Sequence, residues 1–286
     1  MITVFTPSYN RKHTLGALYK SLLKQDTKNF EWLIVDDGSK DNTEEYVKEL
    51  QKENKIKINY VYKQNGGKHS AYNVGLENAK GDVFVCIDSD DEFKENVLGH
   101  IEKDFKSIEK KSDIAGFMYV QNYTNDKDKT IGTGFKEDGM IDTYYNIYHK
   151  HNVTGDKLIV FKTKVAKEFC FPIIEDERFV PEALIYNRTN SKYKFVCSNF
   201  VTSYKEYLQE GYSNNYFKLV KKNPLGNMLY FRELYDIEKR LYNIYGYILF
   251  GIYGKKKLRY MIKNHPAKIR IFFLYVPVYF ISLIKK

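Results

Sequence analysis

Apolar and polar positions alternate with two different periods along the first 90 residues. Short apolar runs of strand length recur, and segments with helix-spaced apolar residues separate them. This alternation of strand and helix predicts a parallel sheet with helices on its faces. The predicted strands cover residues 2–6, 31–37, 57–63 and 82–87, and the predicted helices cover residues 13–25, 42–53 and 70–79, with Asn42 as a possible cap.

Each of these four predicted strands ends in a cluster of polar residues. In chain order the clusters are "TPSYNR" (6–11), "DDGSKDN" (36–42), "QNGGKHS" (64–70) and "DSDDEF" (88–93). Parallel strands bring their carboxyl ends to one edge of the sheet, and ligands of open α/β sheets bind there. A purely structural protein does not require four such clusters on one edge, so the sequence predicts a binding site.

The pattern is looser beyond residue 93. Helices are expected at 96–111 and 181–189, strands at 114–123 and 156–163, and one or two strands within 192–206. From about residue 213 the chain is predicted to be mainly helical. We therefore expect an α/β domain over residues 1–205 and a helical, basic and aromatic region over residues 206–286.

The last cluster crowds four carboxylates into residues 88–92. Like charges this close need a compensating positive charge, which solvent, a basic side chain or a metal ion can provide. Asp88 and Asp90 lie two positions apart at a strand end, so their carboxylates can face the same side. Hard cations such as Mg²⁺ combine few carboxylates with diphosphate oxygens. An acidic turn before a helix is the alternative, which the three companion clusters disfavour.

The other clusters offer complementary groups. Asp36 and Asp37 can accept hydrogen bonds from a nucleobase or a ribose, although an Asp-Gly turn is common by itself. The glycines of "NGGKHSAYNVG" (65–75), together with Lys68, suit an anion, and the segment matches neither a P-loop nor a G-x-G-x-x-G fingerprint. The first cluster offers side chains to a base or phosphate, namely Thr6, Tyr9 and Arg11, or else marks the start of a helix.

In this order and spacing, the motifs resemble those of family 2 glycosyltransferases with the GT-A fold, closely over residues 1–93 and more loosely to about 205. The resemblance implies a nucleotide-sugar half (1–93) and an acceptor half (94–205). It implies an inverting transfer of a sugar from a nucleotide-sugar, most commonly a UDP-sugar, with Mn²⁺ or Mg²⁺ as cofactor. The implied acceptor is a glycan hydroxyl, carried on a polyprenyl diphosphate in bacterial polysaccharide assembly.

The resemblance also implies roles for individual residues. Thr6 and Asp37, with Asp36 as neighbour, would hold the nucleobase and ribose. Asp90 would ligate the metal with support from Asp91. Asp88 would contact the ribose or a metal-bound water. The implied donor residues are Thr6, Pro7, Tyr9, Arg11, Asp36, Asp37, Lys68, Asn73, Asp88 and Ser89, and the implied metal ligands are Asp90 and Asp88. Where the family often has "ARN", this chain has "AYN" (71–73), so an arginine contact is missing or replaced by Lys68.

An inverting transfer needs a general base on the acceptor side. In the family this base opens a helix that precedes a basic segment, and "PEALIYNRTNSKYKF" (181–195) puts Glu182 at that position. The nearby "EDER" (175–178) makes Asp176 the first alternative, followed by Glu175, Glu177 and Asp156. Glu182 also reads as an ordinary carboxylate at a helix N-terminus. Asp156 and Asp91 are assigned to acceptor binding.

The positive charge of the chain lies in its last 48 residues. The chain holds 46 Lys and Arg against 36 Asp and Glu, and residues 239–286 contain eleven of the basic residues and none of the acidic ones. The apolar run 271–284, which contains Pro277, is shorter than the roughly 20 residues that span a bilayer. We expect this region to lie on a membrane surface, with packing against protein as the alternative. No nucleic-acid partner is expected.

The three scattered cysteines form neither a disulfide framework nor a zinc site, which indicates buried thiols in a reducing compartment. The chain begins with a predicted strand and not with a secretory signal. The expected location is therefore cytoplasmic, peripheral on the inner face of the cell membrane. Two other functions are considered: a non-catalytic nucleotide-sugar- or glycan-binding membrane partner, and a sugar-phosphate nucleotidyltransferase, whose glycine-rich N-terminal loop with arginine is absent here.

Overall fold

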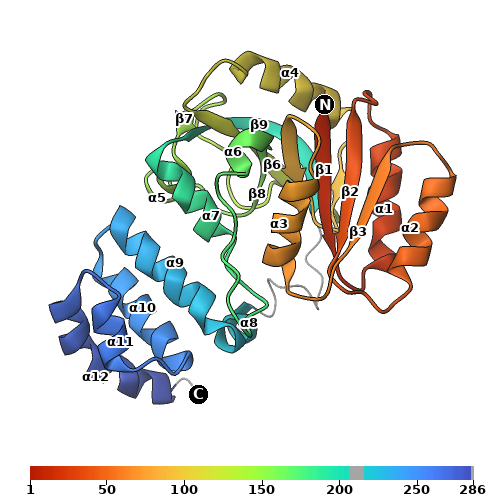
Figure 1. Ribbon diagram of the computed structural model, residues 1–286. Coiled ribbons are helices and arrows are strands. Elements are labelled where there is room, and N and C mark those ends of the chain that lie inside the picture. The colour runs from red at the N-terminus through yellow and green to blue at the C-terminus, as the bar shows by residue number, and fades with distance from the viewer. Residues whose placement is uncertain (206–215, 285–286) are drawn as a thin grey trace. The chain divides into compact units, whose positions relative to one another are not determined.

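The computed structural model describes residues 1–205 and 216–284 (Figure 1). The chain folds into two compact units. Unit 1 contains residues 1–170 and 188–205, and unit 2 contains residues 171–187 and 216–284. This division differs from the expected boundary at residue 205 in one respect, since residues 171–187 group with the C-terminal helices.

Within residues 1–205, unit 1 is built on one nine-stranded sheet. The strands are β1 (Ile2–Ser8), β2 (Phe30–Asp36), β3 (Ile58–Tyr62), β4 (Val83–Cys86), β5 (Glu92–Phe93), β6 (Ile114–Tyr123), β7 (Ile141–Asp142), β8 (Lys157–Lys162) and β9 (Lys194–Lys205). Their order is β3-β2-β1-β4-β8-β6-β9-β5, and β7 also pairs with β9. Strands β1–β4, β6 and β9 run in one direction, whereas β8, β5 and β7 run against their neighbours. The ends of β1–β4 and of β9 therefore lie on one edge.

Helices cover both faces of this sheet (Figure 1). They are α1 (Lys12–Leu23), α2 (Thr43–Lys52), α3 (Lys68–Asn78), α4 (Val97–Ile108), α5 (Tyr144–His149) and α6 (Thr163–Ala166), followed by a 3₁₀ turn at Thr189–Ser191. The face that carries Val4 and Trp32 packs against α1, α2 and α4. On the opposite face, Phe5 and Phe84 stack on each other and pack against Tyr72 of α3. Both faces are buried, as the continuous apolar strands require.

The expected α/β sheet is confirmed. Every strand and helix predicted for the first 93 residues is present, with ends that differ by a few residues. Asn42 stands at the N-cap of α2, but its φ is +58° and its side chain makes no capping hydrogen bond. Residues 194–205 form one strand, with shifts in register against β6. The sequence analysis missed β5, β7, α5 and α6, which are all too short to show a period.

The cysteines differ from one expectation. All three are free. Cys197 is buried and Cys86 is half-buried, but Cys170 is exposed. The prediction of buried thiols is therefore wrong for Cys170, because the turn after α6 places its side chain at the surface.

Unit 2 is helical in the part of the chain that the structure describes. Its helices are α7 (Ala183–Arg188), which ends at the boundary with unit 1, α8 (Tyr216–Lys222), α9 (Pro224–Ile237), α10 (Leu241–Tyr253), α11 (Leu258–Lys263) and α12 (Lys268–Ile284). Its core joins Met228, Ile248, Met261 and Ile271 from four of these helices. Pro277 lies inside α12 and does not end it. None of the described helices has both the length and the apolar character needed to cross a membrane.

A buried histidine holds the start of α12. His265 is 2% exposed and packs between the rings of Tyr235 and Tyr247, 4.7 and 4.6 Å away. Its Nδ1 accepts a hydrogen bond from the Ala267 N–H at 3.0 Å. Burial, with the nearby charge of Arg232, lowers the pKa of His265 from 6.5 to about 4. The ring is therefore neutral in the folded protein.

This pKa predicts acid-sensitive stability. In the unfolded chain His265 is protonated below about pH 6.5, whereas in the folded chain it stays neutral until about pH 4. The free energy of unfolding therefore falls as the pH is lowered from 6.5 to 4. The full loss attributable to this group is about 3 kcal/mol. Urea unfolding followed by circular dichroism at pH 7 and pH 5 measures it.

The variant His265→Asn is the comparison, because its side-chain oxygen still accepts from Ala267 and does not titrate. The variant should lose less stability than the wild type between pH 7 and pH 5. His13→Asn, which changes an exposed histidine, should behave as the wild type. Equal losses in the wild type and His265→Asn would contradict the prediction.

Candidate active site

Hydrogen bonds join the loops that follow β1 and β2. The Asp37 N–H donates to the Ser8 carbonyl at 2.8 Å, and the Asn10 N–H donates to the Ser39 hydroxyl at 2.8 Å. The Lys40 N–H in turn donates to the side-chain oxygen of Asn10 at 2.8 Å. Helix α1 begins without a side-chain cap. The polar residues after β1 therefore serve the neighbouring loop and not the start of the helix.

The candidate residues of the first loop differ in accessibility. Thr6 is fully buried, and its hydroxyl accepts a hydrogen bond from the indole N–H of Trp32 at 3.0 Å. Pro7 and Arg11 are half-buried, and Tyr9 is 46% exposed. Pro7, Tyr9 and Arg11 thus all reach solvent to some extent, whereas the Thr6 side chain ties β1 to β2.

Asp36 ends β2 and is 1% exposed. Its Oδ1 accepts a hydrogen bond from the Ser39 N–H at 2.7 Å, and its Oδ2 accepts one from the Tyr60 hydroxyl at 2.7 Å. Burial and the Asp36 carboxylate raise the pKa of Tyr60, so its hydroxyl stays a donor. Among the described residues, each oxygen of Asp36 accepts one of the two hydrogen bonds that a carboxylate oxygen can accept.

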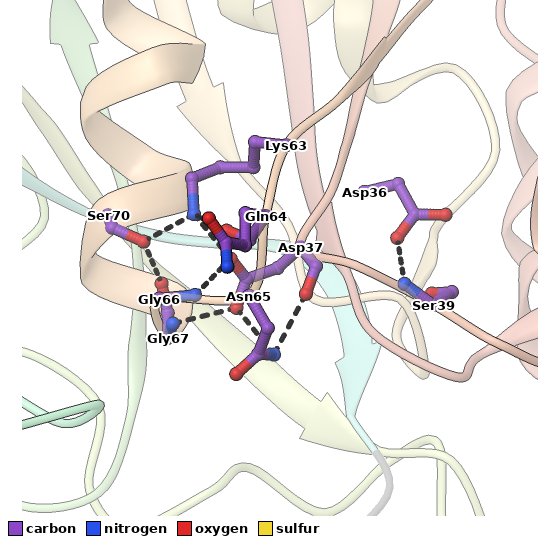
Figure 2. Close-up of polar contacts among 9 residues, drawn as sticks. All are labelled: Asp36, Asp37, Ser39, Lys63, Gln64, Asn65, Gly66, Gly67 and Ser70. Atoms are coloured by element: carbon purple, nitrogen blue, oxygen red, sulfur yellow. Dashed lines mark hydrogen bonds and ion pairs between the residues drawn. The ribbon is translucent and has the colours of Figure 1, made fainter.

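The Asp37 carboxylate organises the loop between β3 and α3 (Figure 2). Oδ1 accepts from Lys63 Nζ at 2.6 Å and from the Gly66 N–H at 2.9 Å. Oδ2 accepts from the Gly67 N–H at 2.7 Å and from the side-chain amide of Asn65 at 3.1 Å. These four donors occupy all four acceptor positions of a carboxylate. The anion that the glycine N–H groups bind here is thus a side chain of the protein.

Helix α3 contributes one basic group to the site. Gly67 precedes it with a φ of +93°, a conformation that glycine adopts without strain. Lys68 Nζ lies 2.5 Å from Asp88 Oδ1. Tyr72, at the position of the missing arginine, is buried in the core, and Asn73 is half-buried. Lys68 is therefore a basic side chain beside the acidic cluster, and its role as a replacement for the arginine stays a prediction.

Two lysines compensate the acidic cluster. Asp88 Oδ2 lies 3.1 Å from Nζ of Lys205, the last residue of β9, while its other oxygen meets Lys68. Lys205 Nζ also lies 3.5 Å from Asp91 Oδ2 and 3.7 Å from Asp156 Oδ2. Within the described residues, the positive charge that the sequence calls for is thus supplied by basic side chains.

The charges of this cluster shift one another's pKa. Burial favours the neutral form of Asp88, but Lys68 and Lys205 outweigh it and hold the pKa of Asp88 well below its usual range. Burial raises the pKa of Asp91, and Lys205 offsets this only in part. Asp91 Oδ1 is buried and has no hydrogen-bond partner among the residues described. Burial disfavours the charged form of Lys205, yet Asp88 and Asp91 raise its pKa well above the ordinary value.

Asp90 differs from its neighbours. It is half-buried, and in residues 1–205 and 216–284 no side chain donates to its carboxylate or pairs with it. Burial and the charge of Asp88 raise its pKa. Ser89 beside it is buried. The described residues contain no group of three or more His, Cys, Asp or Glu side chains that could hold a metal. An ion at Asp90 must therefore take most of its ligands from a bound molecule or from water.

A buried lysine holds the loop before β8. Lys157 is 7% exposed, and burial lowers its pKa to about 8. Its Nζ lies 2.7 to 3.3 Å from the carbonyl oxygens of Ile131, Thr154, Gly155 and Asp156. This arrangement fixes the backbone at Asp156, whose half-exposed carboxylate faces Lys205.

The candidate bases lie in unit 2. Glu182 is exposed and directly precedes α7, and the Tyr186 hydroxyl lies 3.5 Å from its Oε2. Glu175 and Asp176 are exposed, and Asp176 has a φ of +63°. Glu177 is 8% exposed, and its carboxylate accepts from two N–H groups in the first turn of α9 at 2.5 and 2.7 Å. Glu177 therefore has a structural role as the cap of α9.

The sequence analysis missed Lys205 and Lys63. Lys205 ends a segment that was predicted as one or two strands, without its partners. The role of Lys205 could be predicted only if β9 were known to pair parallel to β6. The last residue of β9 then lies on the edge that carries the other clusters. Lys63 follows β3 in the same way and contacts Asp37.

Comparisons with known proteins describe the same region. A family model for glycosyl transferase family 2 matches residues 3–169. The Escherichia coli protein UDP-Glc:alpha-D-GlcNAc-diphosphoundecaprenol beta-1,3-glucosyltransferase WfgD is 30% identical over 269 residues, which cover 92% of this chain and 97% of WfgD. Another curated relative, an uncharacterized glycosyltransferase of Nostoc sp., is longer, and the match spans 39% of it.

Solved structures share the fold. S. aureus TarS 1–349 in complex with UDP-GlcNAc has a TM-score of 0.65 and 18% sequence identity, over 97% of this chain and 89% of TarS 1–349. The mannosyltransferase PcManGT from Pyrobaculum calidifontis, in complex with GDP-Man and Mn²⁺, has a TM-score of 0.58 and 15% identity, over 99% of this chain and 80% of PcManGT. The expected GT-A fold is confirmed by these similarities.

The contacts of Lys205 predict a large cost for its removal. Lys205→Met leaves the buried Asp91 carboxylate without its basic partner and leaves Asp88 with Lys68 alone, so the free energy of unfolding should fall by about 3–5 kcal/mol. In the double variant Lys205→Met/Asp91→Asn, the carboxylate at position 91 is replaced by a neutral amide. The fall in the free energy of unfolding should therefore be smaller than the sum of the falls in the two single variants. Urea unfolding of the four proteins measures this coupling.

Lys106→Met is the matched control, because Lys106 is 75% exposed and its loss should change stability by less than about 0.5 kcal/mol. A loss for Lys205→Met as small as that of the control would contradict a compensating role.

Proposed function

Because the chain belongs to glycosyl transferase family 2, we propose that it transfers a sugar, with inversion, from a UDP-sugar to a hydroxyl of a polyprenyl-diphosphate-linked glycan. The observation that carries this proposal is the meeting of Lys68, Asp88, Asp90, Asp91 and Lys205 beside the loop that Asp37 holds. Such an edge suits a ligand that has a nucleoside at one end and a diphosphate at the other.

The donor would lie along the edge formed by the ends of β1, β2 and β4. Tyr9 and Arg11 are accessible to a base or a phosphate, and Asp36 retains acceptor positions for a ribose or base N–H. Asp37 would contribute indirectly, because its four acceptor positions already hold the loop. Lys68 and Lys205 would face the diphosphate and stabilise the negative charge that grows on it as the sugar leaves.

The residues fit a divalent cation shared with the donor. The carboxylate of Asp90 is half-buried and has no partner side chain within the described residues, and Mg²⁺ binds readily through one or two carboxylates plus phosphate oxygens. We therefore propose Asp90 as the direct ligand, with Asp88 nearby. When bound, the Mg²⁺ or Mn²⁺ would neutralise charge on the leaving diphosphate.

Glu182 is proposed as the general base. A single displacement needs a carboxylate that takes the proton from the acceptor hydroxyl as it attacks the sugar from the side opposite the diphosphate. Glu182 is exposed at the start of α7, with the Tyr186 hydroxyl 3.5 Å from its Oε2, whereas Glu177 is buried and engaged as a cap. Asp156 and Asp91 are proposed to orient the acceptor.

The proposed acceptor class is supported by a relative that aligns over nearly its whole length. WfgD is named for a UDP-Glc donor and a diphosphoundecaprenol-linked acceptor. A polyprenyl chain stays in the bilayer, so an enzyme acting on it works at the membrane surface. We propose the cytoplasmic face, in agreement with the basic region 239–286.

Donor binding is tested by thermal unfolding with UDP, GDP, dTDP and CMP, each with and without Mn²⁺ or Mg²⁺. UDP with metal should raise the melting temperature by several degrees, because a ligand at about 100 times its Kd stabilises the folded state by about 2.7 kcal/mol. The metal-dependent shift should be absent in Asp90→Ala. Asp82→Ala, at a side chain that is 92% exposed, should retain it. A folded protein that responds to none of the four nucleotides would rule out the donor site.

The base is tested by transfer to a synthetic polyprenyl-diphosphate-linked sugar. Glu182→Gln should keep the UDP-induced shift and lower the transfer rate by about 10²–10⁴-fold. Asp176→Asn, in the neighbouring acidic segment, should transfer at nearly the wild-type rate. The reverse pattern would move the base to Asp176, and normal transfer by both variants would exclude the two.

A further inference from the structure

Helix α12 carries apolar side chains on two opposite faces. Its inner face packs into the core of unit 2 through Ile271 and Val278, which are 0% and 2% exposed. The other face is turned to solvent, with side chains between 43% and 74% exposed. We call it the outer stripe: Ile269, Phe272, Phe273, Val276, Phe280 and Leu283.

The outer stripe is continuous along the helix. Its members follow the first one at steps of three, four, seven, eleven and fourteen positions, the spacing of one helix face. The helix of 17 residues is about 26 Å long. Single exposed apolar residues are ordinary, but a contiguous exposed patch marks a surface that is covered in use. Three phenylalanines in one stripe are therefore evidence of an interaction surface.

Positive charge borders the outer stripe. Lys268 and Arg270 flank Ile269 on either side and are exposed. The segment just before α12 adds Arg259 and Lys263, which are also exposed. Residues 239–286 include no Asp or Glu. An apolar face bordered by Lys and Arg is complementary to the headgroups and acyl chains at the surface of an anionic bilayer.

A second copy of the chain fits this surface less well. In a symmetric dimer the same patch faces itself, so the basic residues of both copies would approach one another. Within residues 239–286 no carboxylate is present to pair with them, and like charges at an interface oppose association. Charge therefore selects lipid over a second copy.

We propose that α12 lies in the plane of an anionic membrane surface and inserts its outer stripe into the bilayer. The inner face of α12 stays packed against the other helices of unit 2, so insertion does not require the helical core to unfold. The proposal rests on the proposed function for its setting, since a lipid-linked acceptor requires a membrane-bound enzyme, but the binding it describes is independent of catalysis.

Co-sedimentation of the full chain with vesicles tests the proposal. The protein should bind vesicles of phosphatidylcholine with phosphatidylglycerol, bind phosphatidylcholine alone more weakly, and lose affinity as salt is added. Phe273→Ser/Phe280→Ser should reduce the affinity by about tenfold or more for each inserted ring. Lys268→Gln/Arg270→Gln should reduce it by about fivefold for each charge, and only on the anionic vesicles.

Ile173→Ser/Leu241→Ser is the matched control, since these side chains are 68% and 59% exposed but lie outside α12. It should bind vesicles as the wild type does. The UDP-induced thermal shift is measured on every variant, because an unchanged shift shows an intact fold.

Any of three results would overturn the proposal. The first is a folded wild type that does not bind anionic vesicles. The second is binding by Phe273→Ser/Phe280→Ser that equals binding by the control variant. The third is a wild-type dimer, seen by light scattering, that becomes monomeric in Phe273→Ser/Phe280→Ser without any vesicle binding. Failure of the proposed function would look different, because vesicle binding would persist while the UDP shift and sugar transfer were absent.

Discussion

A lysine ammonium among three carboxylates is the interaction on which the sheet edge depends. Buried charges are tolerated only in compensated groups. Lys205 compensates Asp91 and, together with Lys68, Asp88, and it also lies 3.7 Å from the half-exposed carboxylate of Asp156. The chain leaves β4, passes through the acidic segment and enters β5, which pairs with the end of β9. That pairing brings Lys205 within 3.1 Å of Asp88 and 3.5 Å of Asp91. The pairing of β5 with β9 and the ion pairs of Lys205 therefore favour the same arrangement of strands.

Local sequence was sufficient for the first half of unit 1. Repeated strand and helix periods located β1–β4 and α1–α3, and the polar residues at the strand ends predicted a site on one edge. The glycosyltransferase family follows from the same four motifs. The carboxylates of residues 88–92 also predicted that a positive charge lies nearby, because carboxylates spaced so closely repel one another.

The source of that charge could not be read from the sequence. Lys205 is 117 residues away from Asp88, and nothing local in β9 says that it pairs with β6 and β5. The partners of Asp37 could not be predicted for a similar reason. Its four donors come from the loop after β3, whereas Asp37 follows β2. Helix α12 shows the same limit. A run of apolar residues does not reveal which helix face packs against protein. Only the packing of unit 2 distinguishes Ile271, which is buried in its core, from Phe273, which is exposed.

The closed loop around Asp37 affects how the site discriminates among anions. Consecutive glycine N–H groups commonly form a receptor for phosphate, and free phosphate is an abundant competitor for such receptors in a cell. Here a carboxylate of the same chain already fills that receptor. An incoming phosphate gains nothing from Gly66 and Gly67 unless it displaces Asp37. Recognition of a phosphorylated ligand thus falls to the ammonium groups of Lys68 and Lys205, which are already held by carboxylates, and not to the glycine loop.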